Sequence, residues 1–207
     1  MRIFTTILFL LISAVNFSAQ SRLSTAEAKA FTSRINAGSK NLQTIQADFV
    51  QTKKMDFLKN DIVSSGKMAL QAPNLLSWKY SKPYKYSVVF KNNRIYIDNQ
   101  GKKSSVEAKS KYFEKINRLI SGSVTGNLFS DPEFKVSYYK TGAFTIARFV
   151  PKSSQLLKYI RQIDLYFANS ATTVSRVSMQ EASGDTSDIV FKNTKVNAKL
   201  PAAAFSL

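Results

Sequence analysis

Most of the chain alternates apolar and polar residues with a period of two, which is the pattern of strands that bury one face. Ile45, Ala47 and Phe49 alternate in this way with their polar neighbours, and a polar tip near residues 59–61 follows. Further segments alternate in the same way, and turn residues separate them from one another. They are residues 67–71, 76–80, 84–90, 95–97, 134–138, 144–146, 159–167, 177–179 and 189–191. We therefore expect a mainly β protein with some helix, built from about 10–11 antiparallel strands in a barrel or a sandwich.

Two segments switch to the spacing of a helix. Residues 24–27 (STAE) form a capping box that opens a helix over residues 24–37, with Gly38 as its stop and with Phe31 and Ile35 on its apolar face. A second helix is predicted over residues 108–121. Its apolar positions, spaced to share one face, are Tyr112, Ile116, Leu119 and Ile120. The tail over residues 196–205 is expected to be extended.

The N-terminus has the layout of a secretory signal peptide. Arg2 precedes an apolar run over residues 3–15, and small and polar residues follow up to Ala19. The alternative, an uncleaved membrane anchor, is disfavoured because spanning ~30 Å of hydrocarbon takes about 20 apolar residues. We predict a cleaved signal peptide at residues 1–19 and a single domain over residues 20–207 that is exported to the periplasm.

The composition removes several kinds of chemistry. The 207 residues include no His and no Cys, which excludes Ser-His and Cys-His nucleophile systems, zinc sites of the usual nitrogen and sulfur type, and disulfides. The carboxylates show no spacing that is typical of a catalytic pair. We therefore predict no catalytic residue, no metal site and no cofactor.

The charge is strongly positive, since 30 Lys and Arg residues stand against 13 Asp and Glu, for a formal net charge of +17. Two interpretations stay open: attraction to anionic membranes or acidic partners, and a solvated surface that keeps an apolar-lined protein soluble. Nucleic acid is not expected as a partner, because the chain is predicted to be exported and has no RNA-recognition, helix-turn-helix or zinc-finger pattern.

A set of short motifs extends in order over nearly the whole chain after residue 19. They are residues 45–51 (IQADFVQ), 66–70 (GKMAL), 73–78 (PNLLSW), Pro83, 163–167 (IDLYF), 179–181 (MQE) and 189–191 (IVF). Together they resemble the periplasmic outer-membrane lipoprotein carrier family, LolA, and the first and third motifs are the most specific pair. One position departs from the family: Ala72 stands where members from the best-known bacteria carry an arginine, thought to latch a closed lid.

The resemblance implies an unclosed antiparallel β-barrel with helices covering its concave face, and a lipid-binding cavity between them. It places in the cavity wall Phe49, Met68, Leu70, Leu76, Trp78, Tyr80, Val88 and Phe90. It places in the helical lid Phe31, Ile35, Tyr112, Ile116, Leu119 and Ile120. The function it implies is that of a monomeric chaperone, which takes acylated lipoproteins from an inner-membrane ABC transporter complex to an outer-membrane acceptor.

Two other functions remain open. The first is a carrier of another lipid or acylated intermediate on the same fold, in an envelope or biosynthetic pathway. The second is an adhesion or scaffold domain whose cavity is closed and empty. For any single aromatic residue of a strand, filling a barrel core is the plainer interpretation. A lipid-anchored receptor of the same fold is disfavoured, because the chain has no Cys to acylate.

Overall fold

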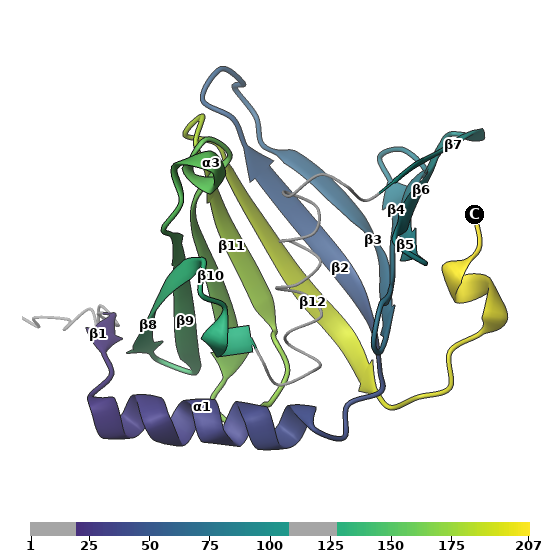
Figure 1. Cartoon of the computed structure of the whole chain (residues 1–207). Coiled ribbons are helices and arrows are strands. Elements are labelled where there is room, and N and C mark those ends of the chain that lie inside the picture. The colour runs from purple at the N-terminus through teal and green to yellow at the C-terminus, as the bar shows by residue number, and fades with distance from the viewer. Residues whose placement is uncertain (1–19, 108–127) are drawn as a thin grey trace, which may run out of the picture.

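One antiparallel sheet of twelve strands forms the body of the molecule and curls into an unclosed barrel (Figure 1). The computed structural model describes residues 20–107 and 128–207. In spatial order the strands are β1 (Ser21–Arg22), β8 (Phe134–Thr141), β9 (Phe144–Pro151), β10 (Ile160–Ala168), β11 (Arg176–Glu181), β12 (Thr186–Val196), β2 (Thr44–Lys54), β3 (Ile62–Gln71), β4 (Leu75–Lys82), β5 (Tyr86–Lys91), β6 (Arg94–Asn99) and β7 (Lys102–Glu107). Because β1 and β7 lie at opposite ends of this order, the described sheet is not closed.

This architecture confirms the predicted fold class, including the antiparallel pairing and the open barrel. The structure adds two strands to those that alternation predicts, and both are edge strands. β1 has only two residues, and every residue of β7 is exposed. A strand without a buried face has no reason to alternate apolar and polar residues, so the sequence pattern could not show it.

Helix α1 (Thr25–Ser39) begins at the predicted capping box. The Ser24 backbone N–H donates to the Glu27 carboxylate at 2.8 Å, and the Glu27 N–H donates to the Ser24 hydroxyl at 3.3 Å. The predicted stop at Gly38 is wrong, because the helix continues one residue beyond it. A Cβ at Gly38 would lie 2.6 Å from the side chain of Thr172, so this glycine permits close contact with the loop after β10.

The other described helices are short: η1 (Leu128–Ser130), α3 (Ser154–Leu157) and η2 (Ala202–Phe205). The predicted helix over residues 108–121 lies outside the described residues. Its four predicted lid residues, Tyr112, Ile116, Leu119 and Ile120, lie outside them as well.

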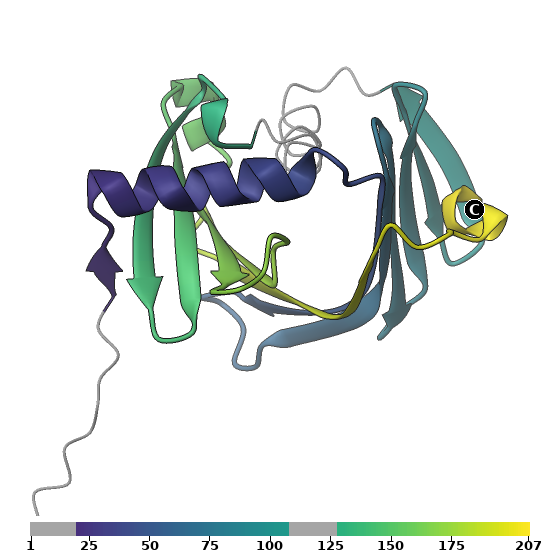
Figure 2. The ribbon, with the colours of Figure 1, turned by 90° about the horizontal axis from the view of Figure 1, so that it is seen from below.

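The C-terminal segment lies on the outer, convex side of the sheet (Figure 2). The prediction of an extended tail is wrong over η2, which is a 3-10 helix. On the outer face of β4, the Lys79 ammonium donates to the carbonyls of Ala203 and Ser206 at 2.9 and 2.7 Å. Val89 on the same outer face is almost fully buried. The tail therefore packs against the outer face of the sheet, a contact that the local sequence pattern does not show.

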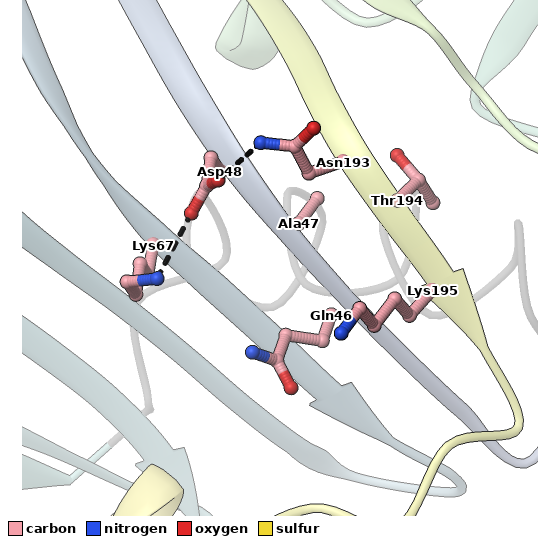
Figure 3. Close-up of a pocket in the computed structure, with 7 residues that line it drawn as sticks. All are labelled: Gln46, Ala47, Asp48, Lys67, Asn193, Thr194 and Lys195. Atoms are coloured by element: carbon pink, nitrogen blue, oxygen red, sulfur yellow. Dashed lines mark hydrogen bonds and ion pairs between the residues drawn. The ribbon is translucent and has the colours of Figure 1, made fainter.

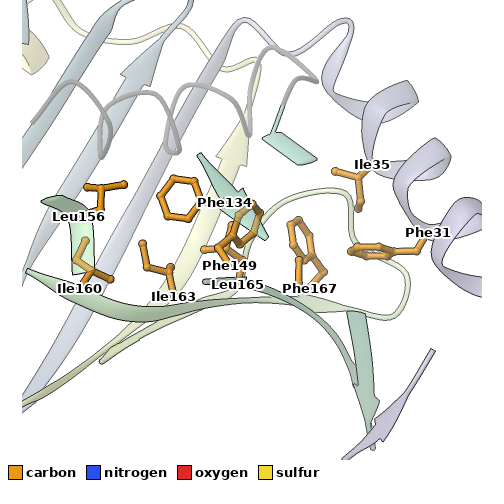
Figure 4. Packing of buried hydrophobic residues seen from close by; sticks show 10 residues of the cluster. Phe31, Ile35, Phe134, Phe149, Leu156, Ile160, Ile163, Leu165 and Phe167 are labelled. Carbon is orange, nitrogen blue, oxygen red and sulfur yellow. The ribbon is translucent and has the colours of Figure 1, made fainter. Parts of the chain in front are cut away.

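Helix α1 covers the concave side of the sheet over β8–β11 (Figure 2). Phe31 and Ile35 project from its buried face into a cluster that contains Phe149 and Phe167 (Figure 4). The Phe31 ring lies 5.3 Å from that of Phe167 and 5.8 Å from that of Tyr138, in edge-on arrangements that aromatic pairs favour. The predicted covering of the concave face by a helix is thus confirmed for α1.

Candidate ligand-binding face of the sheet

The other half of the concave side, over β2–β5, carries the side chains that the sequence assigns to a cavity wall. In the middle row Met68 lies opposite Trp78, which lies opposite Val88 on the next strand. Because side chains alternate between the two faces of a strand, residues two apart share this inner face. The register therefore brings to one face all eight predicted residues: Phe49, Met68, Leu70, Leu76, Trp78, Tyr80, Val88 and Phe90.

Seven of these eight residues, all except Val88, belong to an apolar cluster, here called the inner-face cluster. Its buried members are Leu42, Ile45, Ala47, Phe49, Met68, Leu70 and Leu76, and packed against them are Ala72, Trp78, Tyr80, Phe90, Ile189 and Phe191. The members nearest α1 are almost fully buried, with Leu76 2% exposed and Leu70 3% exposed. Trp78, Tyr80, Val88 and Phe90 are only half-buried, so they offer apolar surface that a ligand can cover.

Aromatic rings form the centre of the inner-face cluster. The Phe49 ring lies 4.5 Å from the Trp78 ring and 5.1 Å from the Tyr80 ring, measured between centroids. Phe191 of β12 completes the group at 6.0 Å from Trp78. Phe191 is not among the residues predicted for the cavity wall, although it lies opposite Phe49 in the sheet. The alternation of residues 189–191 indicates that Ile189 and Phe191 share a face of the sheet. It does not indicate that Phe191 lies next to Phe49, because that depends on the pairing of β12 with β2.

Gly66 makes room between these rings. It stands between Phe49 and Tyr80 in the sheet, at an irregularity in the pairing of β3 with β4. A Cβ built on Gly66 would lie 2.0 Å from the carbonyl oxygen of Lys79, which is backbone and has no freedom to rotate away. Only glycine therefore allows β3 and β4 to approach so closely at this point.

The inner face becomes polar toward the end of β2. Beyond Phe49, the next inner residue is Gln51, whose side-chain oxygen accepts a hydrogen bond from the Tyr80 hydroxyl at 2.7 Å. The next is Lys53, whose ammonium lies 2.9 Å from the Glu181 carboxylate and 3.8 Å from that of Asp185. Along one strand the wall thus passes from apolar to hydrogen-bonding to charged.

The aromatic centre contains two polar groups, the Tyr80 hydroxyl and the Trp78 indole N–H, and only the hydroxyl has a hydrogen-bond partner in the described residues. Burial raises the pKa of Tyr80, and the neighbouring Trp78 indole N–H partly offsets this effect. No hydrogen bond forms there, however, and the buried indole N–H has no acceptor within residues 20–107 and 128–207. A buried donor without an acceptor is a place where a ligand carbonyl gains a hydrogen bond.

The predicted lid residues of α1 lie over the other half of the sheet. Phe31 and Ile35 pack in the cluster of β8–β11, and the structure does not place them in the inner-face cluster. Ala72, at the position of the family arginine, is half-buried against the inner-face cluster, and its N–H donates to the Gln43 carbonyl at 2.8 Å. Its methyl side chain has no group that could form a polar latch.

The outer face carries a polar groove of about 470 Å³ where β12 bulges beside β2 (Figure 3). Its carboxylate, Asp48, accepts a hydrogen bond from the Asn193 amide at 2.8 Å and lies 3.1 Å from the Lys67 ammonium. Both contacts hold the pKa of Asp48 below its usual range. Through these contacts Asp48 of β2 links β12 and β3. A polar groove of this kind does not suit an apolar ligand.

Two features of the described residues bear on other functions. In those residues no three His, Cys, Asp or Glu side chains gather where they could hold a metal ion. Among the same residues, the helices are all too short or too polar to span a membrane.

Comparison with known proteins identifies the family. The profile described as "Outer membrane lipoprotein carrier protein LolA" matches residues 40–207. An outer-membrane lipoprotein carrier protein of Legionella pneumophila is 30% identical over 185 residues, which cover 88% of this chain and 85% of that protein. In fold, the chain is similar to a DUF1329 family protein from Desulfovibrio piger, with a TM-score of 0.50, 11% identity, and coverage of 87% and 96%. It is also similar to a structure of the Pseudomonas aeruginosa MucA/MucB complex, with a TM-score of 0.51, 10% identity, and coverage of 87% and 61%. The match over most of its length shows that the chain belongs to the outer membrane lipoprotein carrier family LolA.

Proposed function

We propose that this protein carries acylated lipoproteins across the periplasm, with their acyl chains bound on the inner face of β2–β5. The observation that carries the proposal is the continuous apolar surface of the inner-face cluster on an open sheet. Membership of the LolA family supports the class of cargo. In this proposal residues 1–19 are removed as a signal peptide, and residues 20–207 act as a monomeric carrier domain. It receives cargo from an inner-membrane ABC transporter complex and delivers it to an outer-membrane acceptor.

The physical need for such a carrier is large. Three acyl chains contain roughly 48 methylenes, and exposing them to water costs on the order of 40 kcal/mol at ~0.8 kcal/mol each. A curved apolar sheet removes these chains from water without forming a bond. The work is binding and release, so the proposal assigns no catalytic residue, no metal ion and no cofactor, and it treats the protein as a carrier and not as an enzyme.

The polarity of the wall favours one direction for the bound chains. We place their methyl ends toward Leu70 and Leu76, where the wall is apolar and most buried. Their carbonyl ends then lie toward Gln51 and Lys53, where the wall becomes polar. The indole N–H of Trp78 lies between these regions and is able to donate to an ester or amide carbonyl. The proposal keeps the role that the family resemblance implies for the predicted helix over residues 108–121, which is to form part of the lid over the bound chains.

Ala72 favours a second candidate, a carrier of another lipid or acylated intermediate on the same fold. Because Ala72 replaces the family arginine, release of the ligand cannot be controlled by a latch at this position. A cargo that differs from that of the other family members is one reason why release would be controlled differently. The two candidates share the binding face and differ in the cargo.

Release of newly made lipoproteins from spheroplasts tests the proposal. The protein is expected to release them into the medium, and Trp78→Asp is expected to abolish release by placing a charge in the inner-face cluster. Thr194→Asp, on the exposed polar outer face, is the matched control and should release as the original protein does. Circular dichroism of both variants checks that the sheet is folded. Failure of the original protein to release any lipoprotein, with lipid binding retained, would leave the second candidate.

A further inference from the structure

The exposed large apolar side chains gather at one end of the barrel. In an antiparallel sheet alternate connections lie at the same end, so the connections over residues 55–61, 83–85 and 152–159 share one end, here called the hairpin end. Figure 1 shows it at the top, opposite α1. Of ten exposed large apolar side chains in the described residues, seven lie at this end. Since exposed apolar side chains are normally scattered singly, this concentration marks a contact surface.

The hairpin that joins β2 to β3 supplies four of the seven side chains. Phe57 is 75% exposed and Val63 is 57% exposed, and Leu58 and Ile62 are 41% and 40% exposed. Figure 1 shows this hairpin projecting beyond its neighbours at the hairpin end. The sequence predicts a polar tip here, because Lys59, Asn60 and Asp61 dominate the local pattern.

The other three apolar side chains come from two separate connections. Tyr84, between β4 and β5, is 68% exposed, and Tyr159, just before β10, is 58% exposed. Leu157 at the end of α3 is 42% exposed. Three connections far apart in the sequence thus present apolar tips at the same end.

Exposed lysines accompany each of these tips. They are Lys54 and Lys59 in the hairpin, Lys82 and Lys85 on either side of Tyr84, and Lys158 between Leu157 and Tyr159. Acidic residues lie at this end as well: Glu181 and Asp185 lie within ion-pair distance of Lys53, and Asp61 lies 3.9 Å from Lys54. With Asp56 also exposed in the hairpin, the excess positive charge of the three tips comes chiefly from Lys82, Lys85 and Lys158. Apolar and aromatic tips flanked by lysines are the combination that binds the interface of an anionic bilayer.

We propose that the hairpin end docks on the surface of an anionic lipid bilayer, with Phe57 and Leu58 entering the headgroup region. The flanking lysines then lie at the level of the lipid phosphates, and the amphipathic rings of Tyr84 and Tyr159 lie at the interface. The inner face of the sheet turns polar at this same end, through Gln51 and Lys53. Docking therefore brings the polar mouth of the binding face to the membrane. The docking itself does not depend on the cargo proposed above.

Co-sedimentation with vesicles tests the proposal, using protein purified from the periplasmic fraction. We expect the protein to bind vesicles of phosphatidylethanolamine and phosphatidylglycerol, to bind phosphatidylcholine vesicles less, and to lose affinity as salt is raised. The double variant Phe57→Ser with Leu58→Ser should lose at least about tenfold in apparent affinity, because two apolar side chains no longer leave water. The matched control is Val106→Ser with Val196→Ser, which removes two apolar side chains elsewhere that are 48% and 45% exposed and should bind as the original protein does.

Equal binding by the hairpin variant and the original protein would overturn the proposal, as would a lack of binding to anionic vesicles. The second outcome would assign the hairpin end to a protein partner. The hairpin variant should still bind acyl chains, because Phe57 and Leu58 are exposed and stand apart from the inner-face cluster. A loss of acyl binding with vesicle binding intact would count against the proposed function alone.

Discussion

Replacing Gly66 with alanine tests the close approach of β3 and β4 that shapes the binding face. The added Cβ would lie 2.0 Å from the Lys79 carbonyl oxygen and 2.8 Å from the Tyr80 Cα. Real Cβ contacts essentially never fall under 3.0 Å, so at least one of the two strands has to move by about 1 Å. Neither neighbouring atom belongs to a flexible side chain, which leaves no cheaper way to relieve the contact.

The cost follows from the interactions next to Gly66. Moving the strands weakens the flanking ladder hydrogen bonds, worth about 1 kcal/mol each. It also disturbs the Phe49–Trp78 and Phe49–Tyr80 ring pairs, worth about 0.5–1.5 kcal/mol each beyond their buried area. We expect Gly66→Ala to lower the free energy of unfolding by about 3–5 kcal/mol. For a chain of this size that corresponds to a fall in Tm of about 6–20 °C.

Thermal and urea unfolding measure this loss, with Gly101→Ala as the matched control. Gly101 has a φ of +91° with no atom near the added Cβ, so alanine there costs only about 1–2 kcal/mol of backbone strain. Trp78 is the sole tryptophan, and its emission should shift in Gly66→Ala and stay unchanged in Gly101→Ala. A Gly66→Ala protein within about 1 kcal/mol of the original, with unchanged emission, would refute the close approach of the two strands.

Three further changes test the electrostatics and the tail. Asp164→Ala should lower the free energy of unfolding in urea by about 3–5 kcal/mol, because the nearly buried Asp164 accepts two hydrogen bonds from Arg148 at 2.7 and 2.9 Å. Asp188→Ala, which breaks a more exposed pair, should lower it by less than about 1 kcal/mol. The pKa of Glu27 is lowered to about 2, chiefly by a lysine hydrogen bond, so its stabilisation is present above the unfolded pKa of 4.5 and is lost as pH falls toward 2. Glu27→Gln should therefore unfold more easily than the original at pH 6, with the difference shrinking toward pH 2; a constant difference would contradict this. Lys79→Met should loosen the C-terminal segment and speed its trimming by carboxypeptidase, although the Lys103 ammonium still donates to the Leu207 carbonyl at 2.9 Å. An unchanged trimming rate would show that the Lys79 contact does not hold the segment in place.

The sequence predicts the inner face of β2–β5 well, because its strands each bury one face. Alternation places Leu76, Trp78 and Tyr80 on one side of β4, and hairpin turns fix the neighbours. Asn92 and Asn93 both adopt positive φ, as the predicted tight turn between β5 and β6 requires. Local rules were enough where a strand buries one face and pairs with its neighbour in the sequence; β7, which pairs with β6 but has no buried face, was missed.

What the sequence misses depends on contacts between distant segments. Gly38 was expected to end a helix, but its role depends on Thr172 in another part of the chain. Phe191 joins the inner-face cluster only because β12 pairs with β2 across more than a hundred residues. Phe57 stood among polar turn residues, and its exposure at a shared end of the barrel became visible only once the topology was known.

Quenching of Trp78 fluorescence by brominated acyl chains tests the central claim most directly. Trp78 lies in the middle row of the proposed binding face, and no other tryptophan in the chain contributes to the signal. Fatty acids carrying bromine near the carboxyl end should quench its emission saturably, and chains brominated near the methyl end should quench less. Unbrominated chains should reverse the quenching by competition. Binding detected by another method without any quenching of Trp78 would contradict the account, because the chains would then lie elsewhere.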